Sequence, residues 1–217
     1  MKKLEAMRKN NMDEKVKEEL LMFHTFKQQY QFELKPIIKK QNDYYVDGEL
    51  LQHGEEKAMG ETEKWINAGY QLKGDYCKVL SNLFPYEFTF RGKQMQSIES
   101  FFQGIKIKEK NTQDYIFQYS GLEANVLKSA SDYNWQENGI LYWQGNPIKR
   151  DSQEYDDMIE ELYICAIQNP LYRNVLKRIE KPIIHSIGKE AKEETTFTRY
   201  EFEKMLNCLV AFLKGKE

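Results

Sequence analysis

The chain has 217 residues, which suits one domain with an extension or two small domains. Its 32 Lys and Arg nearly balance 34 Asp and Glu, so the charge argues against a nucleic-acid coat protein or a membrane-surface binder. Three widely spaced cysteines without CxxC, and three histidines without HExxH, indicate neither a disulfide framework nor a metal site. We expect buried thiols and no metal or other cofactor.

The absence of familiar motifs narrows the classes further. GxGxxG, GxxxxGK[ST] and GxSxG do not occur, which argues against dinucleotide-binding Rossmann, P-loop and α/β-hydrolase proteins. No apolar run approaches the roughly 18 residues of a membrane span, and acidic residues interrupt the basic opening MKKLEAMRKNNMDEKVKEELL where a signal peptide would be apolar. We therefore expect a cytoplasmic protein without a membrane partner.

The first third of the chain predicts a helical extension. Apolar residues over 4–26 keep a loose helical spacing, and Pro36 ends the pattern. Asp47-Gly48 predicts a turn with a short strand and hairpin over 42–48, and 61–68, with a glycine behind it, predicts a short helix. We read residues 1–62 as a helical N-terminal extension or partner surface.

The next stretch predicts a hairpin followed by a helix. The alternating residues around 86–93 favour a short hairpin that closes at Arg91-Gly92. Ser97 is a good N-cap for a helix whose apolar face is formed by Ile98, Phe101, Phe102 and Ile105. At 100° per residue, one border of that face carries Glu99, Gln103 and Lys106.

The second half predicts an aromatic loop and three helices. Residues 134–150 have no period and read as a loop or short turns that hold Trp135, Tyr142 and Trp143. Asp151 with Glu154 forms a capping box for a helix that stops at Asn169-Pro170.

Pro170 suits the first position of the next helix, which runs to Lys181-Pro182. Residues 183–188 predict a short extended segment, and Thr198 with Glu201 caps a last helix. The expected fold class is mainly α, of the α+β kind, with a few short strands.

Glu99, Gln103 and Lys106 offer a specific chemistry. Cleavage of an N-glycosidic bond develops positive charge at the anomeric carbon, so an enzyme needs a nearby anion or nucleophile and a proton donor. Glu99 can stabilise that charge, a shielded Lys106 amine can attack as a nucleophile, and Gln103 can hold a ribose hydroxyl. By spacing alone the three are equally a solvated helix flank.

Three stretches resemble the NADAR superfamily. LSNLFPYEFTFRGKQMQSIESFFQGIKIK (80–108) resembles the pattern in which Ser-Asn-Phe begins a strand, a glycine turn follows, and a Ser/Thr-x-Glu-x-x-x-Gln-x-x-Lys helix comes next. LYWQGNPIKRDSQEYDDMIEELYICAIQNPLYRNVLKRI and IIHSIGKEAKEETTFTRYEFEKMLNCL are similar to one branch of the superfamily. The resemblance covers roughly 65–209 and implies a compact helical NADAR/YbiA-like domain over 63–217.

The resemblance also implies an activity and a site. Members of the superfamily break a ribose C–N bond, either in phosphorylated ribosylamino intermediates of riboflavin synthesis or between ADP-ribose and guanine in nucleic acid. The implied catalytic residues are Glu99 and Lys106. The implied substrate-binding residues are Ser81, Asn82, Phe84, Gln103, Trp143, Arg150 and Asp151.

One element departs from the pattern. Many members carry Asp-x-x-Trp-Gly late in the chain, where this sequence has His185-Ser186-Ile187-Gly188. His185 can replace that element as a catalytic proton donor near neutral pH, or it is a hydrogen-bonded core residue.

The sequence therefore predicts a metal-free N-glycosidase that hydrolyses the bond between a phosphorylated ribose and an amine. The expected partners are an ADP-ribosyl or ribose-phosphate substrate, with ADP-ribosylated nucleic acid among them; the string Arg91, Lys93, Lys106, Lys108 and Lys110 favours the larger anionic ligand. Two alternatives stay open. One is a non-catalytic module that binds ADP-ribose or an NAD-derived nucleotide, and the other is a helical partner-binding protein that acts through residues 1–41. The oligomeric state is unknown.

Overall fold

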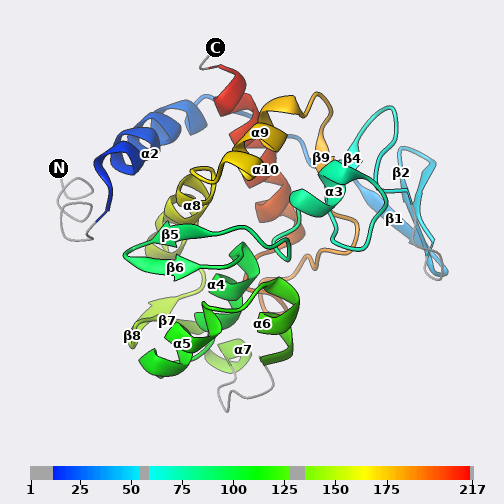
Figure 1. Cartoon of the computed structure of the whole chain (residues 1–217). Coiled ribbons are helices and arrows are strands. Elements are labelled where there is room, and N and C mark those ends of the chain that lie inside the picture. Colours follow the sequence, from blue (N-terminus) through cyan, green and yellow to red (C-terminus); the bar gives the residue numbers. More distant parts are fainter. Residues whose placement is uncertain (1–11, 54–58, 128–134, 216–217) are drawn as a thin grey trace. The chain divides into compact units, whose positions relative to one another are not determined.

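Helices and short strands are interspersed along the chain, so the protein is α+β and mainly helical, as the sequence predicted (Figure 1). The computed structural model describes residues 12–53, 59–127 and 135–215. The chain divides into two compact units, each made of two separate segments. The first unit joins Met1–Gln29 to Pro85–Arg173, and the second joins Tyr30–Phe84 to Asn174–Glu217. The boundary that the sequence places at residue 62 stays a prediction.

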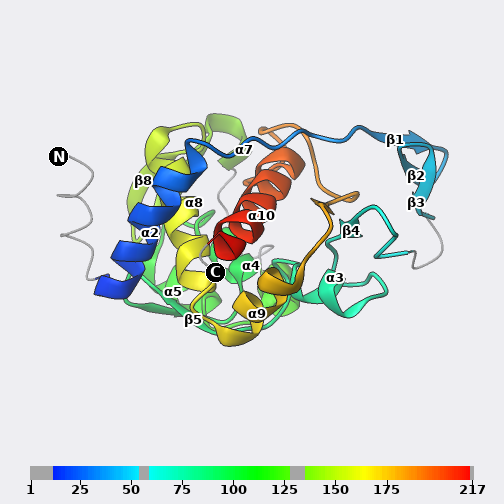
Figure 2. The ribbon, with the colours of Figure 1, turned by 90° about the horizontal axis from the view of Figure 1, so that it is seen from above.

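The first unit contains most of the helices. Its elements are α2 (Glu14–Lys27), β5 (Phe88–Phe90), β6 (Lys93–Met95), α4 (Ile98–Gly104), α5 (Lys110–Ile116), α6 (Gly121–Leu127), α7 (Trp135–Asn138), β7 (Ile140–Trp143), β8 (Asn146–Lys149) and α8 (Gln153–Ala166). Asp13 caps α2, which runs alongside α8 (Figure 2). The predicted start of this helix before residue 12 lies outside the described residues.

The second unit contains the remaining strands. Its elements are β1 (Ile37–Lys40), β2 (Asp43–Val46), β3 (Glu49–Gln52), β4 (Ile66–Asn67), α3 (Asp75–Val79), β9 (Ile183–Ile184) and α10 (Arg199–Lys214). Strands β1, β2 and β3 form an antiparallel meander, and β4 pairs with β9 in parallel. The boundary between the units falls within α9 (Pro170–Arg178), which begins at the proline that the sequence predicted.

Three hairpins close with the same two-residue turn. In Asp47-Gly48, Arg91-Gly92 and Gln144-Gly145 both residues have positive φ, between 47° and 86°. Such turns match the right-handed twist of the flanking strands, and glycine adopts this conformation without steric cost. The predictions of turns at Asp47-Gly48 and Arg91-Gly92 are confirmed.

Two predicted elements are wrong. Residues 61–68 form no helix: Ile66 and Asn67 are extended and buried, and Ile66 pairs with Ile183, more than 100 positions away. Residues 135–149 are ordered elements, namely α7 and the β7–β8 hairpin, not a loop. Leu141 and Ile148 pair across that hairpin and are both buried. Their packing stabilises the two strands although the sequence shows no strand period.

The helix caps follow the sequence more closely. Ser97 caps α4, and Thr198 with Glu201 forms the predicted capping box of α10. The predicted Asp151 cap is wrong by one residue, because the hydroxyl of Ser152 accepts the Tyr155 N–H. A Ser hydroxyl at this position satisfies a backbone donor that the first turn leaves open.

The core of each unit can be described separately. In the first unit, Trp143 packs against the rings of Phe90, Phe101 and Phe117. In the second unit the buried residues of one cluster are Val46, Leu51, Trp65 and Ile184.

The thiols of Cys77, Cys165 and Cys208 are free and buried, as predicted. Burial raises the pKa of Cys77 to about 11. None of the helices in the described part of the chain is long and apolar enough to cross a membrane.

Candidate functional site

Helix α4 presents the candidate catalytic carboxylate. Ser97 fixes its start, since the Ser97 hydroxyl accepts the N–H of Ser100 at 3.0 Å. Ile98 and Phe101 are fully buried and anchor the apolar face that the sequence predicted. The helix ends at Gly104, so Lys106 lies in the turn that follows it.

Glu99, Gln103 and Lys106 are joined by hydrogen bonds in one row. The Gln103 Nε2 donates to Glu99 Oε1 at 2.5 Å, and the Lys106 Nζ donates to Gln103 Oε1 at 3.0 Å. Gln103 is only 5% exposed, whereas Glu99 and Lys106 are half-buried. The amide thus lies between a carboxylate and an amine that both reach the surface.

This row fixes the orientation of the amide. Only the nitrogen of Gln103 can donate to Glu99, and only its oxygen can accept from Lys106. A carboxylate and an amine held on either side of an oriented amide are the groups that charge stabilisation and nucleophilic attack require. In the part of the chain that the structure describes, no three His, Cys, Asp or Glu residues are grouped to hold a metal ion.

Trp143 and Arg150 both lie in the first unit, but each contacts a different residue. The arginine over the Trp143 ring is Arg91, at 5.9 Å, and the ring under the Arg150 guanidinium is Tyr155, at 4.7 Å. Arg150 is buried. Asp151 is exposed, with an oxygen 3.6 Å from Lys149 Nζ.

The predicted basic string is partly neutralised within the first unit. Arg91 donates to the carboxylate of Glu161 from Nε at 3.0 Å and from Nη2 at 2.7 Å. The Nζ of Lys93 lies 2.6 Å from the carboxylate of Asp114. Two of the five basic residues in the string are therefore paired with carboxylates of the protein and offer less charge to a large anionic ligand.

Ser81, Asn82 and Phe84 lie in the second unit, in a turn after α3. The Ser81 hydroxyl accepts the N–H of Leu83, and its carbonyl accepts the N–H of Phe84. Ser81 is buried, and Asn82 and Phe84 are half-buried. The resemblance associates this motif with a strand, but here it forms a turn.

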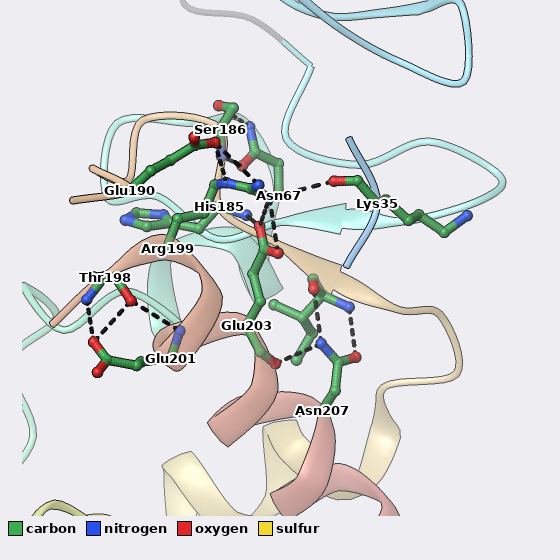
Figure 3. A network of polar contacts seen from close by, with 11 residues as sticks. Lys35, Asn67, His185, Ser186, Glu190, Thr198, Arg199, Glu201, Glu203 and Asn207 are labelled. Carbon is green, nitrogen blue, oxygen red and sulfur yellow. Dashed lines mark hydrogen bonds and ion pairs between the residues drawn. The ribbon is translucent and has the colours of Figure 1, made fainter. Parts of the chain in front are cut away.

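His185 lies in the second unit directly after β9 (Figure 3). Its Nδ1 is 2.8 Å from the carbonyl oxygen of Ala68, and its ring packs against Phe202 with centroids 4.6 Å apart. Because a carbonyl only accepts, Nδ1 carries the proton and Nε2 keeps its lone pair. Burial lowers the pKa of His185, which favours the neutral ring, and its role as a proton donor stays a prediction.

The backbone around His185 is held by buried polar side chains that the sequence analysis missed. Asn67 forms two hydrogen bonds with Ser186, and Asn207 bonds the backbone N–H and carbonyl of Ile183 (Figure 3). The hydroxyl of Ser186 also donates to Gln52. No local pattern marks these residues, because their partners are distant in the sequence. They fix the β4–β9 pair and the segment after it.

The candidate residues therefore fall into two groups. Hydrogen bonds bring Glu99, Gln103 and Lys106 together, and a single turn contains Ser81, Asn82 and Phe84. The first unit holds Glu99, Gln103, Lys106, Trp143, Arg150 and Asp151, and the second holds Ser81, Asn82, Phe84 and His185.

The fold and the candidate site define an α+β protein with a row of carboxylate, amide and amine groups along a short helix and the turn that follows it. A model of the family described as bacteriophage protein GP30.3 matches residues 76–210, and the chain belongs to that family. A relative from Enterobacteria phage T4, described as an uncharacterized 17.1 kDa protein in the Gp30-rIII intergenic region, is 34% identical over 134 residues. The match covers 60% of this chain and 88% of the relative.

A solved structure, the NMR structure of the E. coli protein YbiA, is also similar to the chain. It has 16% sequence identity and a TM-score of 0.43, over 73% of this chain and 87% of that chain. The similarity is too low to transfer any functional residue.

Proposed function

We propose that the protein is an N-glycosidase of the NADAR type, which hydrolyses the bond between a phosphorylated ribose and the nitrogen of a base. The observation that carries the proposal is the hydrogen-bonded row of Glu99, Gln103 and Lys106. These are the three residues whose types and spacing match the superfamily pattern. Contact between them is a property that a merely solvated helix flank does not require.

The row suits the charges of the reaction. As the C–N bond breaks, its electron pair leaves with the base nitrogen, which takes a proton, and the anomeric carbon gains positive charge before water adds its oxygen there. The carboxylate of Glu99 can stabilise that charge or take the proton of the attacking water. Its hydrogen bond from Gln103 keeps the carboxylate in place.

Lys106 has two possible roles in this scheme. As a neutral amine it would attack the anomeric carbon, and the base nitrogen would leave with the C–N electron pair and take a proton. Opening of the ribose ring would then give a Schiff base on Lys106, which water later hydrolyses. As an ammonium it would stay a fixed positive charge beside a phosphate or ribose oxygen. Gln103, which bonds both neighbours, orients the two groups, and its contact with a sugar hydroxyl stays a prediction.

Both substrate classes stay in the proposal. ADP-ribose on guanine and ribose 5-phosphate on a riboflavin-pathway pyrimidine offer the same bond and the same anionic sugar. The basic residues favour the larger ADP-ribosyl ligand less than the sequence suggested, because Arg91 and Lys93 are paired with carboxylates of the protein.

The test is release of free base from each substrate class. The purified protein is incubated with ADP-ribosylated guanosine, with ADP-ribosylated DNA and with the ribosylamino-pyrimidine phosphate, and the products are separated by chromatography. We expect Glu99→Gln and Lys106→Met to lower the rate by about 100-fold or more, the usual loss for a positioned acid–base group. Lys149→Met, a change at an exposed lysine of the same unit, is the matched control.

Borohydride separates the two roles of Lys106. A stable adduct on Lys106 after reduction in the presence of substrate supports the Schiff base. An active enzyme without that adduct leaves Lys106 the role of a fixed charge.

A non-catalytic module that binds ADP-ribose or an NAD-derived nucleotide is the second candidate. In this function Lys106, held by its hydrogen bond to Gln103, supplies only positive charge to a phosphate. Binding of ADP-ribose by calorimetry, without base release from any of the three substrates, would support this function and reject the hydrolase.

A further inference from the structure

The side chain of Gln113 connects two segments of the first unit. Gln113 is fully buried on α5, and its amide makes three hydrogen bonds to backbone groups. Nε2 donates to the carbonyl of Ile107 at 2.5 Å and to that of Tyr142 at 2.8 Å, and Oε1 accepts the N–H of Gln144 at 2.8 Å. One amide thus holds the segment after α4 and the β7–β8 hairpin at the same time.

These bonds fix the backbone on both sides of Lys106. The carbonyl of Ile105, just before it, accepts the N–H of Tyr142 at 2.7 Å, and the carbonyl of Ile107, just after it, accepts from Gln113. Lys106 therefore stands between two anchored peptide groups. The direction in which its side chain leaves the backbone depends on both anchors.

An amide is the side chain that this position requires. Two carbonyls and one N–H must be satisfied by one planar group, which needs two donors and one acceptor, as glutamine provides. A carboxylate would lack both donors and would bring its charge against two carbonyl oxygens. The start of α5 is itself fixed, because Glu109 accepts the N–H groups of Asn111 and Thr112.

We infer that Gln113 is a positioning residue, which sets the backbone at Lys106 and so places its amine beside Gln103. This inference rests on the proposed function, in which Lys106 acts at the anomeric carbon. Gln113 acts through the Ile107 carbonyl and the β7–β8 hairpin.

The experiment compares Gln113→Glu and Gln113→Met with Gln118→Glu, an exposed control on the turn after α5. Gln113→Met has a side chain of similar length without the charge that Gln113→Glu introduces. It is used where the carboxylate prevents folding. The first readout is amide hydrogen exchange at Tyr142 and Gln144. The second is the rate at which formaldehyde and cyanoborohydride methylate Lys106, measured by peptide mass spectrometry with Lys149 as the internal reference.

We expect exchange at Tyr142 to rise about 5–10-fold in both Gln113 variants, because both lose the donor that holds the Tyr142 carbonyl. Exchange at Gln144 should rise as much in Gln113→Met, which has no acceptor for that N–H. Methylation of Lys106 relative to Lys149 should change by about threefold or more, because the amine loses its fixed placement. On a substrate that the wild type cleaves, kcat should fall by about 10–100-fold with a much smaller change in KM. Gln118→Glu should leave all of these values unchanged.

Failure of the inference is distinguishable from failure of the proposed function. A wild type that cleaves no substrate rejects the function, and exchange and methylation then decide on Gln113 alone. Unchanged exchange and unchanged Lys106 methylation in the Gln113 variants would overturn the inference, whatever the activity. So would increased exchange in an enzyme whose kcat and Lys106 methylation stay at the wild-type values.

Discussion

Arg199 donates two hydrogen bonds to the carboxylate of Glu203, one turn further along α10, at 3.2 and 3.1 Å. Both side chains are buried in the second unit, and the same carboxylate accepts the N–H of His185 at 2.7 Å. Burial raises the pKa of Glu203, although the neighbouring Arg199 opposes that shift. The charge of Glu203 is therefore tolerated only because its partners are present.

Removing Arg199 alone should be strongly destabilising. We expect Arg199→Met to lower the free energy of unfolding by about 3–5 kcal/mol, since a buried carboxylate is left without its counter-charge. Arg199→Met combined with Glu203→Gln should lose less, because the glutamine oxygen still accepts from His185. Urea unfolding measures both, and Glu190→Gln, at a 74% exposed partner of Arg199, should cost less than about 1 kcal/mol. A double variant as unstable as the single one would contradict this account.

His185 should make stability depend on pH. Its pKa in the folded protein is lowered by burial from the ordinary value of 6.5, so the unfolded chain binds the proton more tightly. The contribution of the neutral ring is fully present above about pH 7 and is lost as the pH falls through the folded pKa.

The matched variant is His185→Asn, whose amide nitrogen can still donate to Ala68 but does not titrate. The free energy of unfolding, measured between pH 5 and 8, should depend less on pH for this variant than for wild type. The control His53→Asn changes a histidine outside this network, beside Asp43, and should leave the His185 contribution in place. The same pH dependence of stability in wild type and His185→Asn would show that His185 is not its source.

Two ion pairs near the β5–β6 turn should differ in how much they stabilise the fold. The Arg91–Glu161 pair is bidentate and largely buried, whereas Lys93–Asp114 is about 30% exposed on both sides. We expect Arg91→Ala to lower the free energy of unfolding by about 2–4 kcal/mol, because Glu161 stays buried, and Lys93→Ala to cost about 1 kcal/mol or less. Chemical denaturation of the two variants gives the comparison, and equal losses would show that burial of Glu161 is not the cause.

Gly104 should not accept a larger side chain. A Cβ on this residue would lie 2.3 Å from the ring of Phe117, so a shift of the ring or of α4 is unavoidable. Gly104→Ala should therefore destabilise by about 1–3 kcal/mol, although alanine is the better helix former. Thermal unfolding of Gly104→Ala with Phe117→Leu should reveal a smaller loss than the sum of the two single changes. Simple additivity would point to a cause other than the clash.

The predictions that succeeded depend on local chemistry. The turns at Asp47-Gly48 and Arg91-Gly92 and the caps at Ser97 and Thr198 each follow from a few neighbouring residues. The row of Glu99, Gln103 and Lys106 was accessible for the same reason, since one helix and its end bring these side chains together.

The predictions that failed depend on distant partners. The pattern over 61–68 is helical in isolation, yet Ile66 and Asn67 gain a parallel partner strand and burial from Ile183 and Ile184. Gln113 gave no signal, because its carbonyl partners lie 6 and 29 positions away and any buried glutamine looks the same in a sequence. The aromatic stretch 135–149 was misread since its packing partners, such as Phe90 and Phe117, are in other elements.

The alternation of the two units along the chain has a consequence for synthesis. Ile66 leaves the ribosome long before Ile183, so the β4–β9 pair cannot close until residues 183 and 184 have emerged. Helix α2 must likewise wait for α8. Because pairings between distant segments form slowly and leave apolar strands uncovered meanwhile, we expect nascent chains stopped before residue 183 to engage chaperones and to be sensitive to proteases.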